Sequence, residues 1–280
     1  MKNSSSILDS IKSKFVAIII PLEILIAVLI YMYILENPAN FQGGDPSNHP
    51  LPDNYLGIIY KGGFIVPILI SLLLLVITFG IERLLIISKA KGKGDVRKFV
   101  AKVKSLLAKE QITDAIQACN EQKGSVANVV KSGLIKFQEE AKSIHSTESE
   151  KQIVAIQKEI EETTLLEMPM LEKNLVIIST IASIATLMGL LGTVMGMIKA
   201  FAAIATAGAP DAVALANGIS EALINTALGI GTSALAIIAY NYFTNKIDAL
   251  THSIDEASYS IIQHFSAFKK TRKSTFKEVA

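Results

Sequence analysis

The chain has 280 residues, of which 50% are hydrophobic, and its mean hydropathy of +0.43 is too high for an ordinary soluble protein. Its 27 basic and 25 acidic side chains leave a net charge of +2, which gives no reason to expect a nucleic-acid partner or an acidic substrate. A single cysteine excludes an internal disulfide framework. The four histidines have no metal-ligand spacing, so we expect no metal site.

Four stretches are apolar and long enough to cross a bilayer as helices. The first, residues 15–35, contains one charge, Glu23. A signal peptide is the competing interpretation, but this stretch is too long, contains Pro21 and has no small-residue cleavage site. The other expected spans cover residues 64–88, 174–207 and 212–245. The sequence therefore predicts an all-α integral membrane protein with four transmembrane helices.

The distribution of lysine and arginine predicts the orientation of these helices. Basic residues collect in the leader (1–14), in residues 89–173 and in the tail (246–280), whereas residues 36–63 contain only Lys61 and the turn at 208–211 contains none. Because basic flanks resist translocation, we expect both termini and residues 89–173 to be cytoplasmic. Residues 36–63 and 208–211 then form a periplasmic loop and a periplasmic turn.

The two larger extramembrane regions differ in character. Residues 36–63 are rich in Pro, Gly, Asn and Asp, which predicts a loop without a core. Residues 89–173 have apolar residues at helical intervals, which predicts a helical cytoplasmic domain. We expect its last helix to continue toward the third span, with a kink at Pro169.

Small residues recur every three or four positions along the third and fourth spans, which indicates flat helix faces. Lipid gives helices no hydrophobic reason to associate, so such faces allow close backbone approach instead. Simple packing, without any conducted species, remains an open interpretation of this pattern. The glycines that we assign to helix packing are Gly189, Gly192, Gly196, Gly218 and Gly229.

Polar residues inside this hairpin suggest a conducted ion. A carboxylate within a span costs on the order of 2.5–3.5 kcal/mol on insertion, so Glu221 should face a partner or a water-filled cavity. Counted from the turn at about 1.5 Å per residue, Lys199 has a similar depth, so the two can form an ion pair. A paired Glu221 stays ionised, whereas an unpaired one in a dry pore tends to be protonated. Thr193 and Thr226 form a second polar level, which Asn225 connects to the first.

The segments LMGLLGTVMGMIKAF (Leu187–Phe201) and GISEALINTALGIGTSALAIIAYN (Gly218–Asn241) resemble the paired signature of the MotA/TolQ/ExbB proton channel family, and are most similar to its ExbB and TolQ branch. In that family a threonine on the first hairpin helix, a glutamate on the second and a threonine five residues later line the pore. The matching positions are Thr193, Glu221 and Thr226. The residues that we expect along the ion pathway are Thr193, Glu221, Asn225, Thr226 and Thr232.

Two features depart from the family pattern. The first span is an additional helix in front of the usual three. Lys199 occupies a position where better-known members have an uncharged side chain or histidine.

The resemblance implies a homo-oligomer in the bacterial inner membrane, a pentamer in this family, whose pore holds the single-span helices of an ExbD/TolR-type partner. The proton-motive force would drive a periplasm-spanning protein such as TonB or TolA. We therefore expect an ExbB-like subunit serving TonB-dependent outer-membrane transport. A TolQ-like subunit for envelope maintenance, a motility stator and a structural membrane scaffold are the alternatives. With no phosphate-binding loop and no paired nucleophile and base, we expect no enzyme and no cofactor.

Overall fold

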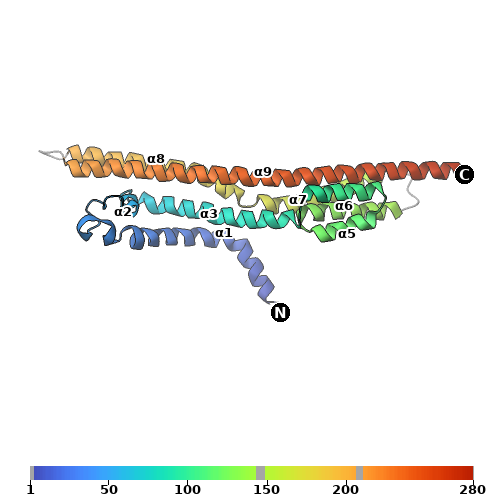
Figure 1. The fold of residues 1–280 in the computed structure, drawn as a ribbon, viewed down its shortest axis with the longest axis horizontal. Coiled ribbons are helices and arrows are strands. Elements are labelled where there is room, and N and C mark those ends of the chain that lie inside the picture. The colour runs from blue at the N-terminus through green and yellow to red at the C-terminus, as the bar shows by residue number, and fades with distance from the viewer. Residues whose placement is uncertain (1–2, 143–148, 206–210, 280) are drawn as a thin grey trace. The chain divides into compact units, whose positions relative to one another are not determined.

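The computed structural model describes residues 3–142, 149–205 and 211–279, and this part of the chain is helical apart from short connections (Figure 1). Within it, the only strand-like pairing is an isolated bridge between Phe41 and Pro50. The expected all-α class is confirmed. The α-helices are α1 (Asn3–Leu29), α2 (Tyr55–Tyr60), α3 (Ile65–Lys91), α4 (Val96–Ala108), α5 (Ile112–Gln122), α6 (Gly124–Lys142), α7 (Ser149–Glu172), α8 (Leu175–Ala205) and α9 (Ala212–Val279).

Among the described residues, four helical segments are long and apolar enough to cross a membrane. The first is Phe15–Leu35, and the others begin at Ile65, Glu150 and Ala212. The predicted number of transmembrane helices is thus confirmed.

Apart from Asp211, the expected turn at 208–211 lies outside the described residues. The Asp211 side chain accepts hydrogen bonds of 3.0 Å from the Val213 and Ala214 amides, which caps the start of α9.

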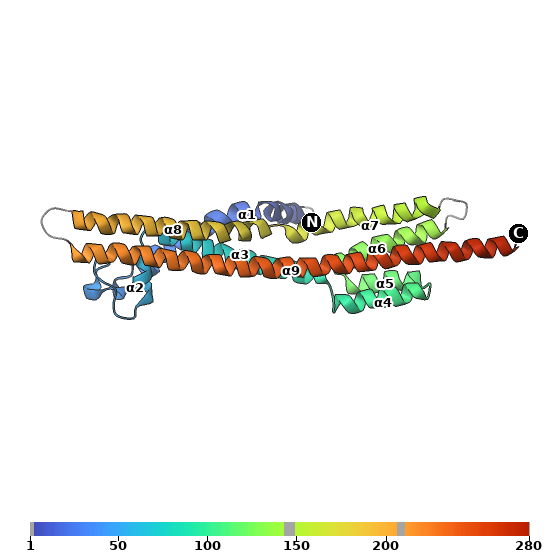
Figure 2. The same cartoon turned by 90° about the horizontal axis from the view of Figure 1, so that it is seen from above.

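The chain divides into two compact units. The first, here called the membrane unit, comprises Met1–Ile81 and Leu175–Tyr240, and the second, the helical unit, comprises Glu82–Asn174 and Asn241–Ala280. In the membrane unit α8 and the first part of α9 lie side by side (Figures 1 and 2). The additional helix α1 packs on α3 through an edge-on contact between Phe15 and Phe79.

The helical unit is built by sequential packing of α4 on α5, α5 on α6 and α6 on α7. The later part of α9 completes its core, where the Phe137 and Phe265 rings meet edge to face with centroids 4.9 Å apart.

Cys119 is buried in this unit, and burial raises the pKa of its thiol to about 12. The thiol is therefore a buried apolar group with little thiolate character.

The junction after α7 contains a break that the sequence does not predict. Pro169 is accommodated inside α7, but the helix ends at Glu172 and α8 begins only at Leu175. Asn174 has φ +67°, a left-handed conformation that asparagine tolerates better than most residues and that ends a helix. The last helix of the cytoplasmic domain therefore leads toward the third span, as expected, but α7 and α8 are separate helices because the chain leaves the helix at Asn174.

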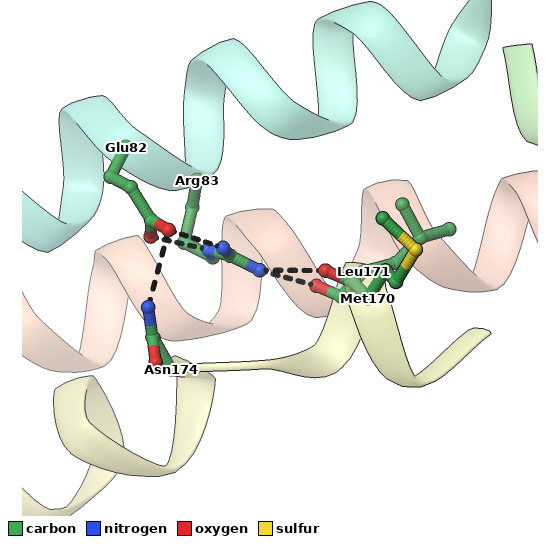
Figure 3. A network of polar contacts seen from close by, with 5 residues as sticks. All are labelled: Glu82, Arg83, Met170, Leu171 and Asn174. Carbon is green, nitrogen blue, oxygen red and sulfur yellow. Dashed lines mark hydrogen bonds and ion pairs between the residues drawn. The ribbon is translucent and has the colours of Figure 1, made fainter. Parts of the chain in front are cut away.

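Arg83 stabilises this helix end (Figure 3). Its side chain is fully buried and donates hydrogen bonds to the Met170 and Leu171 carbonyls, at 3.2 and 3.0 Å. These carbonyls belong to the last turn of α7, where backbone acceptors have no intrahelical partner and the helix dipole favours a cation. The Glu82 carboxylate accepts hydrogen bonds of 2.6 and 2.7 Å from the Arg83 guanidinium. It also accepts one of 3.2 Å from the side-chain amide of Asn174.

We expect replacement of Arg83 by Met to lower the free energy of unfolding by about 3–5 kcal/mol, because it leaves Glu82 without its cation and the Met170 and Leu171 carbonyls without their donor. The measurement is the thermal midpoint of the purified protein in detergent. Arg97→Met, at an exposed position of α4, is the matched control. Equal midpoints for the two variants would contradict the assigned role of Arg83.

The segment between the first two spans also differs from expectation, because it does contain packed side chains. Phe41 is 2% exposed, and α2 provides regular structure. The Asn40 amide donates to the Ile34 and Leu35 carbonyls at 2.8 and 3.0 Å. Hydrogen bonds from polar side chains to backbone carbonyls thus order a segment that has few apolar residues. The prediction of a loop without a core is corrected accordingly.

Candidate functional site

The site is built on the close approach of α8 and α9. A Cβ atom added to Gly196 would lie 2.6 Å from both the Ala222 nitrogen and the Gly218 oxygen. A Cβ on Gly218 would lie 2.6 Å from the Ala200 nitrogen. Because the neighbouring atoms belong to the backbone, they cannot rotate away, and only glycine fits at these positions.

The other three glycines assigned to packing lie at the same contact. A Cβ on Gly229 would lie 2.8 Å from the Gly189 Cα, and one on Gly189 would lie 3.0 Å from the Asn225 oxygen. A Cβ on Gly192 would collide with the Asn225 side chain. The glycine stripe therefore brings the polar residues of the two helices close together.

Glu221 forms an ion pair with Lys199 across this contact. The Lys199 Nζ lies 2.7 Å from Oε1 and 2.8 Å from Oε2 of Glu221. The Glu221 side chain is 9% exposed, whereas that of Lys199 is 52% exposed. The carboxylate is thus buried and neutralised by a lysine that reaches it from a more open position.

A turn before α3 covers the same carboxylate. Gly63 has φ +72°, and a Cβ there would lie 2.8 Å from Glu221 Oε1. Asn225 is fully buried, and its Nδ2 donates to the Gly62 carbonyl at 2.8 Å. Its Oδ1 accepts no hydrogen bond from the described part of the chain. A buried acceptor of this kind is where an ordered water is expected.

Thr193 and Thr226 meet through their hydroxyl groups. The Thr193 hydroxyl is also within 3.2 Å of the Gly189 carbonyl, and the Thr226 hydroxyl is within 3.0 Å of the Ala222 carbonyl. Each hydroxyl has one proton, so only one of them can donate across the helix contact at a time. Their mutual hydrogen bond can therefore reverse its direction.

Two further intramembrane polar residues have different surroundings. Thr232 is 3% exposed and lies about two helical turns beyond Asn225 along α9, away from the Glu221 pair. Glu23 on α1 is 7% exposed and accepts a hydrogen bond of 2.6 Å from Thr78 on α3. Glu23 thus joins the additional helix to the second span.

The sequence does not indicate that Gly63 lies against Glu221 or that Gly62 bonds to Asn225. The signal that could have pointed to them is the glycine pair itself, placed between a turn-rich segment and an apolar span. No pattern in the sequence shows which helix such a turn contacts.

Residues 121–256 match the profile of the MotA/TolQ/ExbB proton channel family. The Tol-Pal system protein TolQ of Haemophilus influenzae is 36% identical over 108 residues, which are 37% of this chain and 46% of that protein. The biopolymer transport protein ExbB of Helicobacter pylori is 42% identical over 81 residues, 29% of this chain and 56% of that protein. ExbB of Pseudomonas putida is 35% identical over 86 residues, 31% of this chain and 26% of that protein. The match thus spans about half or less of each of these relatives.

Proposed function

Given that the chain belongs, through residues 121–256, to the MotA/TolQ/ExbB proton channel family, we propose that it is the channel-forming subunit of an inner-membrane motor driven by the proton-motive force. The family resemblance noted in the hairpin sequence is thereby confirmed. The observation that carries the proposal is the buried Glu221 carboxylate at the α8–α9 contact, with Lys199, Asn225 and the threonine pair around it. A buried intramembrane carboxylate is expensive and usually functional.

Several copies of the chain, five by analogy with the family, would surround a pore with α8 and α9. Single-span helices of an ExbD/TolR-type partner would occupy that pore. In the family the partner provides an aspartate that takes up and releases the proton. Moving one charge through 100 mV makes about 2.3 kcal/mol available, which is enough to bias a conformational step without nucleotide hydrolysis.

The process that this motor drives is proposed as TonB-dependent outer-membrane transport, in the manner of ExbB. Relatives named TolQ match at similar identity, so envelope maintenance with a TolA-like protein is the alternative within the same class. The chain is purified with its native companions, and the mass of the complex is measured. The companions found in it distinguish the two roles. A TonB-like protein supports the ExbB-like role, whereas a TolA-like protein supports the alternative.

A structural scaffold is the alternative from another class, and Thr193→Val tests it. Valine keeps the shape of threonine and removes the hydroxyl that meets Thr226. Loss of one hydrogen-bonding group, worth about 1.4 kcal/mol in the barrier, should lower proton flux about tenfold. The measurement is the acidification of liposomes that contain the complex with its single-span partner.

The matched control is Thr186→Val, on the same helix, where the hydroxyl bonds to the Ala182 carbonyl at 3.4 Å. Its flux should stay within about twofold of the parent protein, a change below about 0.5 kcal/mol. A Thr193→Val complex that assembles and conducts normally would support the scaffold instead.

A further inference from the structure

The additional first helix ends next to the candidate pathway, in an unusual conformation. Its last residues, Ile30–Leu35, form a π-helix. The Glu36 amide closes this segment with a hydrogen bond of 3.0 Å to the Tyr31 carbonyl. π-Helical segments are rare and are found frequently at functional sites. This one sets the position of Tyr31 and Glu36.

Two tyrosines and a carboxylate form a continuous polar chain here. The rings of Tyr31 and Tyr60 are stacked, with centroids 5.0 Å apart and an interplanar angle of 22°. The Tyr60 hydroxyl donates to Glu36 Oε1 at 3.2 Å. The Tyr31 hydroxyl lies 3.4 Å from the Tyr60 carbonyl, and the two hydroxyls interact with each other.

Tyr60 remains a neutral phenol in this arrangement. Burial and the adjacent Glu36 carboxylate both raise its pKa, with burial the larger cause. A neutral phenol has one proton to donate and lone pairs to accept another, so it can pass a proton on without becoming an anion.

The inner end of this chain is connected to the turn that lies against Glu221. A Cβ atom on Gly63 would be 2.8 Å from the Glu221 Oε1. The Tyr60 carbonyl accepts a hydrogen bond of 3.1 Å from the Gly63 amide. This bond connects the tyrosine pair to the turn that covers Glu221. The unpartnered Oδ1 of Asn225 at the same turn gives a water molecule a place to bind.

We propose that Glu36, Tyr60 and Tyr31 form a proton access path from the segment of residues 36–63 to Glu221. The proposal rests on the proposed channel function and extends it, because it gives the additional helix a role in ion entry. A protonated Glu36 gives its proton to the Tyr60 oxygen while the Tyr60 proton passes to Tyr31. The Tyr31 proton passes through water to the Glu221 carboxylate. Both phenols end neutral, Glu36 ends ionised, and the newly protonated Glu221 releases Lys199.

A purely structural role for the cluster is the competing explanation, and the hydroxyl groups separate the two. Tyr→Phe variants keep the stacked rings and remove only the proton-carrying groups. Tyr33 provides a matched control, because it lies in the same π-helix but is 72% exposed.

The experiment measures proton flux into liposomes that contain the full-length chain together with its single-span partner. We expect Tyr31→Phe and Tyr60→Phe each to reduce flux at least fivefold, and Glu36→Gln to do the same. Tyr33→Phe should conduct like the parent protein. All complexes are compared at equal assembled amounts, measured by size-exclusion chromatography.

The outcomes separate the access path from the channel itself. Normal flux in the Tyr31→Phe and Tyr60→Phe complexes, with flux lost in Glu221→Gln, overturns the access path and leaves the proposed function standing. Normal flux in Glu221→Gln overturns both. Should Tyr31→Phe fail to assemble, Tyr60→Phe and Glu36→Gln decide alone, since both residues lie outside the expected first span.

Discussion

Replacing Glu221 by Gln should abolish proton flux, with a decrease of at least about 100-fold, or about 2.7 kcal/mol in the barrier. Glutamine has nearly the same shape and can still hydrogen-bond, but it cannot carry a proton at this position. The Glu221 side chain is 9% exposed and touches Lys199 and the Gly63 turn, so its carboxylate is the group that these neighbours enclose. The measurement is flux into liposomes containing the complex with its partner.

Glu23→Gln is the matched control for this substitution. Both residues are buried and lie in expected transmembrane helices, but Glu23 is bonded to Thr78 at the α1–α3 contact. The control should keep most of the flux, because that carboxylate joins two helices and does not lie at the α8–α9 contact. Equal flux in the two variants would contradict the role assigned to Glu221.

Lys199 complicates the interpretation of a Glu221 variant, because Glu221→Gln leaves its ammonium without a counter-ion. An uncompensated charge could block conduction or assembly by itself. The double variant Glu221→Gln with Lys199→Met removes both charges and restores local neutrality. It should assemble like the parent protein and still fail to conduct. Recovery of flux in the double variant would show that the lysine, and not the missing carboxylate, caused the loss.

The sequence was sufficient to predict features that depend on local patterns. The four spans follow from apolar length, and the hairpin contact follows from the spacing of small residues such as Gly196 and Gly218. The proximity of Lys199 and Glu221 followed from counting residues on both sides of one turn, because an antiparallel hairpin fixes relative depth.

Features that depend on distant parts of the chain could not be predicted in this way. Asn225 in the fourth span bonds to the carbonyl of Gly62, which precedes the second span, and no periodic pattern links the two. The break at Asn174 was missed because Pro169 is the stronger breaker in the sequence, whereas Arg83, far away in the chain, provides the hydrogen bonds that end α7. Such contacts are set by tertiary packing and leave no local signal.

Replacing Gly196 by Val should prevent assembly of the complex. A Cβ at this position would lie 2.6 Å from two backbone atoms of α9, so the helices would have to separate. Forced separation costs about 3 kcal/mol, and lipid supplies no hydrophobic force to hold the helices together. Gly218→Val should have the same effect, because it enlarges the other side of the same contact.

The control for the glycine substitutions is Gly231→Val, on α9, where an added Cβ would meet no atom of the described chain within 4 Å. The measurement is the amount of full-size complex recovered after purification in detergent. We expect little or none from Gly196→Val and Gly218→Val, because the hairpin that presents Glu221 and the threonine pair cannot close. A normal yield from both variants would show that the α8–α9 contact is not required for assembly, and the geometry on which the ion pathway depends would then lose its support.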